Sequence, residues 1–350
     1  MRISTLSMLL ALTVVSARFT RAEDWPTYRY DNTRQGATSE KLTLPLKSAW
    51  VYQAPAAPKT AFAGPDSRNI EGHDLRHRVN YDDTFQVAVV GDKLYFGSSV
   101  DHHLHCYDLK TGKHNWSFAT GGPIRLAPTV WEGQVYFGSD DGFAYSVDAL
   151  TGRLTWKLRS GPAEEWLLAR GDMISRWPVR TGITITDGIA YFGSGIFPHE
   201  DIYIYAVEAK TGKVLWKKDT ISEADAGRDD LSPQGYLLTS KDSLFVPSGR
   251  SLPAMLDRSN GKLRHKPTIS WRREGVVGGT RAVLADGQLY SGGEHVYVAL
   301  DEATGKSGYG WIDAHQVTFS GNDAYVATGM HLMKLDRKTY IAASRERLKL

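Results

Sequence analysis

Glu-Gly-Gln-Val-Tyr-Phe-Gly-Ser, at residues 132–139, is followed by Val-Asp-Ala-Leu-Thr-Gly-Arg at 147–153 and then by Trp156. The same order, with the same kinds of residue at the same offsets, occurs twice more in the chain. The two further clear copies are residues 91–98, 106–113 and Trp116, and residues 187–194, 207–213 and Trp216. A stretch that returns at a fixed spacing is the mark of a repeat architecture, so the repeat has to be interpreted before any single motif.

Weaker copies continue the series toward the C-terminus. They lie at residues 241–246 with 256–262, at 286–292 with 300–306, and at 321–326 with 335–338. The last of these has neither the glycine nor the tryptophan of the others. The Thr-Gly and Asn-Gly steps recur at roughly the 40 to 50 residues that a four-stranded propeller blade requires. The chain therefore shows six repeat units.

Each unit is expected to form four antiparallel strands joined by tight turns. An Asp-Gly or Gly-Asp pair turns the first strand into the second, and Thr-Gly at Gly112, Gly152 and Gly212 turns the third into the fourth, because glycine accepts the φ values that such turns need. Trp116, Trp156 and Trp216 follow these turns on the outer strand, where a large ring can cover the seam between neighbouring units. We therefore predict an all-β fold, a β-propeller of four-stranded antiparallel blades.

Trp50 lies in a stretch that resembles an outer strand but precedes every complete unit. The last unit lacks that strand. We predict that residues 46–52 pair with the unit at 315–337 and close the ring, which leaves six blades visible; a longer natural chain would hold seven or eight. On this division residues 46–340 form the propeller, and residues 341–350 are either a C-terminal tail or a truncated continuation of the propeller.

Composition agrees with an all-β protein and excludes several functional classes. The chain has 350 residues, with ten Trp, 17 Tyr and 34 Gly, a combination that suits strands and tight turns. Its formal charge of +3 is small and evenly spread, which argues against a nucleic-acid partner. Cys106 is the only cysteine, so no disulfide can form within the chain. We expect a monomer stabilised by packing.

The N-terminus has the order of a secretory signal. Arg2 is followed by an apolar run and then by small residues before a cleavage point after Ala22, so residues 1–22 are predicted to be a signal peptide. A short buried helix is the alternative. Residues 23–45 form an opening segment before the propeller. No later segment has the roughly 18 apolar residues that span a bilayer, so we expect a periplasmic or secreted protein without a membrane span.

The repeat units resemble the PQQ-like, BamB-like propeller family, whose pattern is a strand ending in Gly-Ser and then Ala-x-Asp-x-x-Thr-Gly-x-x-x-Trp. The resemblance covers roughly residues 46–340, and residues 24–31 also look like the opening of exported members. It implies two functions. Quinoprotein dehydrogenases bind PQQ with calcium beside a vicinal cysteine pair, which Cys106 alone cannot form. BamB-like members are non-catalytic scaffolds that bind proteins, but they are lipoproteins, and this chain shows no lipobox.

Aligning the repeats brings one set of residues to the mouth of the central channel. Eight residues before each first turn stand Thr84, Arg125, Arg180 and Gln234, with Arg281 two residues beyond the equivalent position in the next unit. Such donors could converge on an anionic or carbonyl-rich ligand, such as quinone carboxylates or a peptide. The alternative is that they bond only to backbone carbonyls and water. Asp82, Asp83 and Asp313 lie near the same mouth, where they could hold a cation or pair with the arginines.

Other candidates carry weaker signals. His103 and His105 lie on one face of a predicted strand and could ligate zinc or copper, although no third ligand is evident; a solvated strand face is the alternative. Cys106 is expected to be a buried, inert thiol. The insert at 161–178 carries Trp166, Arg176 and Trp177, which suit a partner surface or pack back on the propeller.

The sequence thus predicts an exported, non-catalytic binding or scaffolding propeller whose partner is a protein or a small ligand. The alternative is a PQQ-dependent alcohol or sugar dehydrogenase. In that case Arg125 and Arg180 would hold the quinone, with calcium, and Asp83 would act as the catalytic base.

Overall fold

The structure, a computed structural model, is nearly all β. It describes residues 23–61, 69–70, 73–74, 81–197, 200–219, 221, 230–249, 251–266, 281–292 and 296–347. The predicted signal peptide, residues 1–22, lies outside these ranges. Within them, no helix combines the length and the apolar character needed to cross a bilayer.

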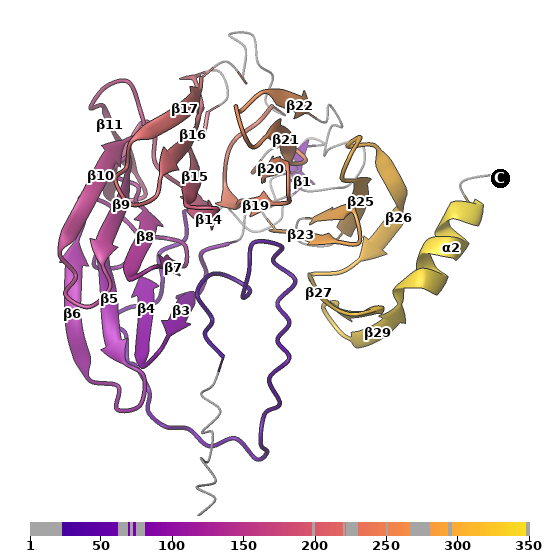
Figure 1. Cartoon of the computed structure of the whole chain (residues 1–350), viewed down its shortest axis with the longest axis horizontal. Helices are drawn as coiled ribbons and strands as arrows, with labels where there is room; N and C mark the ends of the chain where they lie inside the picture. Colours follow the sequence, from indigo (N-terminus) through magenta and orange to yellow (C-terminus); the bar gives the residue numbers. More distant parts are fainter. Residues whose placement is uncertain are drawn as a thin grey trace, which may run out of the picture.

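Six antiparallel sheets follow one another along the chain as blades, named A to F here, and they are arranged in an arc about a common centre (Figure 1). Blades A to E have four strands each and blade F has three. The strands are, for A, β3 (Val87–Val90), β4 (Lys93–Gly97), β5 (His103–Asp108) and β6 (His114–Ala119); for B, β7 (Thr129–Trp131), β8 (Gln134–Gly138), β9 (Phe143–Asp148) and β10 (Leu154–Arg159); for C, β14 (Thr184–Thr186), β15 (Ile189–Ser194), β16 (Tyr203–Glu208) and β17 (Val214–Lys218). They continue, for D, with β19 (Leu238–Thr239), β20 (Ser243–Val246), β21 (Ala254–Asp257) and β22 (Leu263–His265); for E, with β23 (Arg281–Ala285), β24 (Gln288–Gly292), β25 (Val296–Asp301) and β26 (Ser307–Asp313); and for F, with β27 (Gln316–Ser320), β28 (Asp323–Ala327) and β29 (Leu332–Asp336).

Smaller elements connect the blades. Two hairpins, β1 (Asn69–Ile70) with β2 (His73–Asp74) and β11 (Trp166–Ala169) with β12 (Asp172–Ser175), lie outside the blades. The short strands β13 (Thr181–Gly182) and β18 (Gly235–Tyr236) pair in parallel just before the first strands of blades C and D. This pairing brings the segments that precede those two blades together.

The Thr-Gly turns show why the repeat needs its residues. At the turn of blade B, Asp148 accepts hydrogen bonds from the backbone N–H and the hydroxyl of Thr151, at 2.8 and 2.7 Å. Gly152 follows with a φ of +70°, a conformation that favours glycine. A Cβ at Gly152 would come within 2.6 Å of the Trp116 ring of blade A. The glycine therefore serves both the turn and the packing between blades.

The tryptophans of the outer strands of blades A, B and C each join their blade to the next one. Each indole lies on the Thr-Gly or Asn-Gly turn of the following blade, and its Nε1 donates to a backbone carbonyl there. The indole N–H groups of Trp116, Trp156 and Trp216 donate to the carbonyls of Ala149, Ala209 and Arg258, at 3.3, 2.8 and 3.1 Å. Between successive blades the buried apolar side chains form five cores, one for each contact from A–B to E–F.

The opening segment ties the six blades together at the centre of the arc. It exchanges hydrogen bonds with the first strand of every blade. The bonds join Trp25 to Val89 in A, Pro26 to Val130 in B, Asn32 to Ile185 in C and to Thr239 in D, Thr33 to Leu284 in E, and Arg29 to Val317 and Thr318 in F. The side chain of Arg34 is fully buried here and donates to the carbonyls of Tyr28 and Leu237.

The predicted closure of the ring is not found. Residues 46–52 form no strand, and the sheet of blade F contains only β27, β28 and β29. Trp50 instead packs on the Gly112 turn of blade A and donates to the carbonyl of Leu109 at 2.8 Å, as the other outer-strand tryptophans do on their turns. Contacts with blade A therefore hold residues 46–52. The opening segment, which bonds to all six first strands, links the first and last blades in place of the expected strand pairing.

A helix crosses the predicted boundary at residue 340. Residues after β29 form the helix α2 (Arg337–Arg347), which begins within the predicted propeller and continues through most of the predicted tail. Tyr340 and Ile341 of this helix pack against the core between blades E and F. Burial of these two side chains explains why the segment is ordered as a helix that covers the core.

Candidate functional site

Two of the five residues predicted at the channel mouth come together in one charged cluster. Arg125 and Arg180 both contact the carboxylate of Asp140. Gln234 is buried and donates to the hydroxyl of Ser232 at 2.6 Å, and Arg281 donates to the carbonyl of His315 at 3.3 Å. Thr84 is exposed. The alignment of the repeats therefore identified the two arginines of the cluster but not the residue that joins them.

The cluster contains two arginines and two aspartates. Asp140 accepts from Nε of Arg125 at 2.6 Å, and its two oxygens accept from Nε and Nη2 of Arg180 at 2.8 and 2.9 Å. Arg125 also donates from Nη1 to Asp82 at 2.8 Å and to the carbonyl of Lys59 at 2.6 Å. The four side chains are at most 6% exposed. Their formal charges cancel, so the cluster is a neutral, buried ion-pair network.

Burial and charge act in opposite directions on these groups. Burial disfavours the ionised form of Asp140, but Arg180 and Arg125 outweigh it, and the pKa of Asp140 is lowered. For Asp82 burial is the larger effect, and its pKa is raised despite the contact with Arg125. Asp140 is therefore the firmly ionised partner of both arginines. The sequence left two alternatives for the aspartates near the mouth: they could hold a cation or pair with the arginines. For Asp82 the structure shows the pairing, with Arg125.

The centre beside this cluster is filled by the chain's own side chains. Tyr81, Leu126 and Tyr236 belong to one buried apolar group, and Tyr28 of the opening segment packs against it. The rings of Tyr28 and Tyr236 are stacked, with centroids 3.7 Å apart and planes 8° from parallel. The hydroxyl of Tyr81 is buried without a hydrogen-bond partner among the described residues, as is Oε1 of Gln234.

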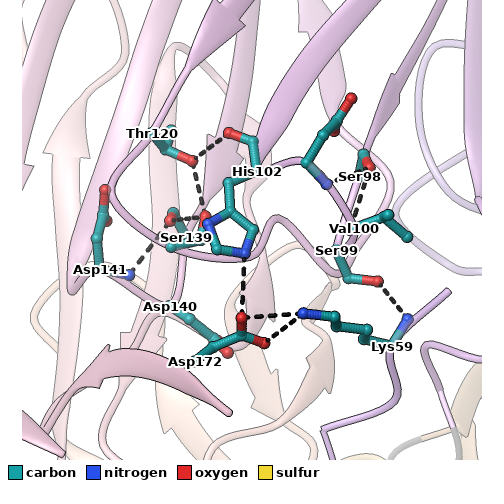
Figure 2. A network of polar contacts seen from close by, with 12 residues as sticks. Lys59, Ser98, Ser99, Val100, His102, Thr120, Ser139, Asp140, Asp141 and Asp172 are labelled. Carbon is teal, nitrogen blue, oxygen red and sulfur yellow. Dashed lines mark hydrogen bonds and ion pairs between the residues drawn. The ribbon is translucent and has the colours of Figure 1, made fainter. Parts of the chain in front are cut away.

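A second polar network lies beside the cluster and holds the β11–β12 hairpin (Figure 2). Asp172, at the start of β12, contacts the Lys59 ammonium at 3.1 Å and lies 3.7 Å from Nε2 of His102. The carbonyl of His102 accepts hydrogen bonds from the backbone and the hydroxyl of Thr120 at 3.0 and 2.8 Å. Burial lowers the pKa of His102, although Asp172 opposes this. Because the Lys59 carbonyl also binds Arg125, the two networks are continuous.

The exposed residues of the predicted partner surface differ from those that the sequence indicated. Trp177 is 5% exposed, lies in the core between blades B and C, and donates to the carbonyl of Glu200 at 3.0 Å, so it is not a surface residue. Arg176 is held by Glu165 and Glu200 at 2.7 and 2.9 Å. Trp166 stays 39% exposed. The sequence missed Leu168 and Met173, which share its face of the hairpin and are 75% and 51% exposed.

The histidine pair lies together on β5, as strand alternation predicts. The rings of His103 and His105 are 5.8 Å apart, and Nε2 of His105 contacts Asp101 at 3.0 Å. Within the described parts of the chain, however, no three His, Cys, Asp or Glu side chains form a group that could hold a metal ion. Cys106 is buried, and burial raises the pKa of its thiol.

The described residues do not fit PQQ with calcium as the resemblance describes it. The two arginines expected to hold the quinone already bind Asp140 and Asp82. Among the described side chains, no three His, Cys, Asp or Glu residues group together where they could hold a metal ion. The chain has a single cysteine and therefore no vicinal pair.

Asp140 and Asp172 are the residues of this site that sequence reasoning missed. Asp140 follows the Gly-Ser that ends the second strand of blade B, where the other two clear copies have Ser99 and Gly195. That departure from the repeat was the available signal. Asp172 lies in an insert with no counterpart in the other units, so no alignment of repeats could place it.

Comparison with known proteins gives one family match. A family model described as outer membrane protein assembly factor BamB matches residues 73–307. A relative from Gluconacetobacter polyoxogenes, named alcohol dehydrogenase (quinone), dehydrogenase subunit, is 31% identical over 161 residues. That alignment covers 41% of this chain and 21% of the relative, so this chain spans about a fifth of the relative's length.

Two solved structures share the fold. BamB from Moraxella catarrhalis aligns with a TM-score of 0.53 and 18% identity, covering 71% of this chain and 67% of that one. A quinohemoprotein alcohol dehydrogenase from Comamonas testosteroni aligns with a TM-score of 0.60 and 16% identity, covering 89% of this chain and 52% of that one. At this level of identity the likeness concerns the β-propeller fold alone.

Proposed function

This chain belongs to the family described as outer membrane protein assembly factor BamB, and from that premise we propose that it is an exported, non-catalytic propeller that binds a protein partner or a small ligand. We place it outside the cytoplasm, in the periplasm or secreted, because residues 1–22 have the order of a secretory signal. We also propose that this chain contributes six blades and acts as a monomer.

The observation that carries the proposal is the neutralisation of Arg125 and Arg180 by Asp140 and Asp82. A quinone site at the mouth would need the charges of both arginines directed at the ligand. Here they are directed at carboxylates, in contacts of 2.6 to 2.9 Å that are almost fully buried. Taking one partner out of such a network leaves an uncompensated buried charge, which is strongly unfavourable. The cluster is better suited to holding the mouth together than to exchanging ligands.

The β11–β12 hairpin supports a protein-binding role. Trp166, Leu168 and Met173 place an apolar face in solvent on a hairpin that is separate from the blade sheets. Exposed apolar faces of this kind, with charged neighbours such as Arg170, are typical of protein contacts. Lys59 pairs with Asp172 next to the turn of the hairpin, so the face is presented by a held element.

A PQQ-dependent dehydrogenase is the second candidate, and the 31% identity to a quinone alcohol dehydrogenase subunit favours it. It would require Arg125 and Arg180 to leave Asp140 and Asp82 for the quinone, with Asp83 as the base. Such an exchange would break the buried ion pairs of Arg125 and Arg180 with Asp140 and Asp82. For that reason we rank it second.

Isothermal titration of residues 23–350 with PQQ, with calcium present and then absent, separates the two candidates. We expect no saturable heat under either condition. Saturable binding that depends on calcium would overturn the scaffold proposal in favour of the dehydrogenase. The control is Arg180→Gln, which removes one of the two donors that the quinone would need.

The protein-binding role is tested on the hairpin face. A double variant, Leu168→Lys with Met173→Lys, is expected to lose partners that the unmodified protein retains in a crosslinking pull-down. Val214→Lys is the matched control, because Val214 is a similarly exposed apolar residue, at 41%, on the outer strand of blade C. Equal retention by all three proteins would contradict a role for the hairpin.

A further inference from the structure

The third strand of each blade is normally buried, and β29 departs from this. The interiors of β5, β9, β16 and β21 are buried, as are residues 297–300 of β25. In β29, the third strand of blade F, Leu332 is 77% exposed and Met333 37%, and of its five residues only Leu335 is partly buried. A third strand of this apolar sequence is therefore in solvent where its equivalents are covered.

The cause is the missing neighbour. In blades A to E a fourth strand pairs with the third, whereas among the described residues β29 pairs with β28 alone. The chain passes directly from β29 into α2, where Asp336 accepts from the backbone N–H of Thr339 at 2.8 Å. Tyr340 and Ile341 then direct this helix against the core between blades E and F. Because α2 departs at the end of β29, the part of the strand that contains Leu332 and Met333 keeps an open edge.

The open edge lies at the end of a series of interfaces. Five buried cores join the six blades in order, and the side of blade F that faces away from blade E has none among the described residues. Tyr325 of β28 is 40% exposed on that side, on the same face as Leu332. Figure 1 shows this side facing the opening of the arc. The surface thus continues the established blade-to-blade packing.

We propose that the edge of β29 binds an extended strand of a partner protein, which completes blade F as its fourth strand. An exposed edge offers unpaired N–H and C=O groups that an added strand can satisfy, while alternate side chains contact the two faces of the sheet. The partner segment should alternate apolar residues, to cover Leu332 and Tyr325. The chain's own candidate, the segment around Trp50, is held on blade A through Leu109 and Gly112. This inference goes beyond the proposed function, because it does not depend on the mouth cluster or on the β11–β12 hairpin.

The chain itself supplies a suitable probe. Residues 213–219, Lys-Val-Leu-Trp-Lys-Lys-Asp, contain β17, which in blade C pairs with the third strand β16. A fluorescein-labelled peptide of this sequence is titrated with residues 23–350 and its anisotropy measured. We expect saturable binding and slower amide exchange across residues 331–336. A second peptide, N-methylated at alternate residues on its pairing edge, should not bind, because it cannot complete the ladder.

Two variants with matched exposure locate the binding. Leu332→Lys adds charge to the edge and should weaken peptide binding by roughly tenfold or more. Leu150→Lys, at 73% exposure in the turn of blade B, should leave it within about twofold, because the residue lies outside blade F. Both side chains are in solvent, so unchanged thermal unfolding verifies that both variants fold.

Three results would overturn the inference. One is equal peptide binding by the protein and Leu332→Lys. Another is slow exchange, before peptide is added, of the β29 amides that point away from β28, which would mean that the chain already pairs this edge itself. The third is a dimer that forms with concentration and is lost in Leu332→Lys, which would make a second copy the occupant. Calcium-dependent PQQ binding would refute the scaffold proposal and leave all three results unaffected.

Discussion

Arg180 and Asp140 face one another in a bidentate pair, with Nε and Nη2 of the guanidinium 2.8 and 2.9 Å from the two carboxylate oxygens. Arg180 precedes blade C and Asp140 follows the second strand of blade B, so the pair joins two blades near the centre of the arc. Both side chains are almost fully buried. This geometry makes Asp140 the anchor of the mouth cluster, since it also binds Arg125.

Replacing Asp140 should destabilise the fold strongly. Asp140→Asn keeps the size of the side chain but leaves Arg125 and Arg180 with too little negative charge, and removing one partner of a buried pair costs about 3 to 5 kcal/mol. Urea unfolding at pH 7 measures the loss. Asp187→Asn is the control, because Asp187 pairs with Arg258 at 2.7 Å but is 73% exposed, and exposed pairs contribute little. A similar loss in both variants would contradict this assignment.

The stabilisation by Asp140 should disappear in acid. Its pKa in the folded protein lies below the value of about 3.9 expected for an unfolded chain, so its contribution is complete at neutral pH and is lost as pH falls through the folded pKa. Asp82 acts in the opposite direction, because its pKa is raised: the folded state gains relative stability as Asp82 takes up its proton.

The comparison isolates Asp140 from the other carboxylates. The difference in the free energy of unfolding between the protein and Asp140→Asn should be constant from about pH 7 to pH 5 and shrink below about pH 4. Urea titrations across this range, at constant ionic strength, give the difference directly. A difference that grows on acidification would have the wrong sign.

Two glycines with similar backbones separate strain from packing. Gly152 and Gly133 have φ values of +70° and +76°, so an alanine at either position should cost about 1 to 2 kcal/mol in backbone strain. A Cβ at Gly152 also meets the Trp116 ring at 2.6 Å, whereas a Cβ at Gly133 meets nothing within 4 Å. Gly152→Ala should therefore be the more destabilising variant in thermal unfolding. Equal losses of stability in the two variants would show that the Trp116 ring moves aside at no energetic cost.

The opening segment should stabilise the blades through Arg34. This guanidinium is fully buried and donates to Thr27, Tyr28, Thr184 and Leu237, and burial lowers its pKa to about 10, which still leaves it charged at neutral pH. Arg34→Met removes all of these hydrogen bonds in a buried setting, so we expect a loss of about 2 to 4 kcal/mol. Faster amide exchange in β14 and β19 should accompany it.

Arg153→Met is the matched control for that variant. Arg153 lies in the exposed turn of blade B, and its replacement should change the free energy of unfolding by about 0.5 kcal/mol or less. If Arg34→Met behaved in the same way, the opening segment would not stabilise the blades through this side chain.

Much of the architecture was readable from the repeat, because its residues act locally. A Thr-Gly turn forms its own hydrogen bonds, as Asp148 and Thr151 do, so its presence at 151–152 predicts the strands on either side. The same alignment brought Arg125 and Arg180 to one place, since equivalent positions in neighbouring blades lie side by side. It could not supply Asp140, which departs from the repeat, or Asp172, which lies in an insert.

The sequence by itself determined the blades: the strand order, the turns and the outer-strand tryptophans of blades A to C follow from short-range hydrogen bonding and the alternation of side chains. Only the tertiary structure decided how the arc ends. Pairing of residues 46–52 with blade F was reasonable from pattern, but Trp50 bonds to blade A, α2 covers the last core, and the opening segment binds all six first strands. These contacts join segments about 30 to 300 residues apart. A local sequence pattern does not show which of the competing contacts buries more surface or satisfies more backbone groups.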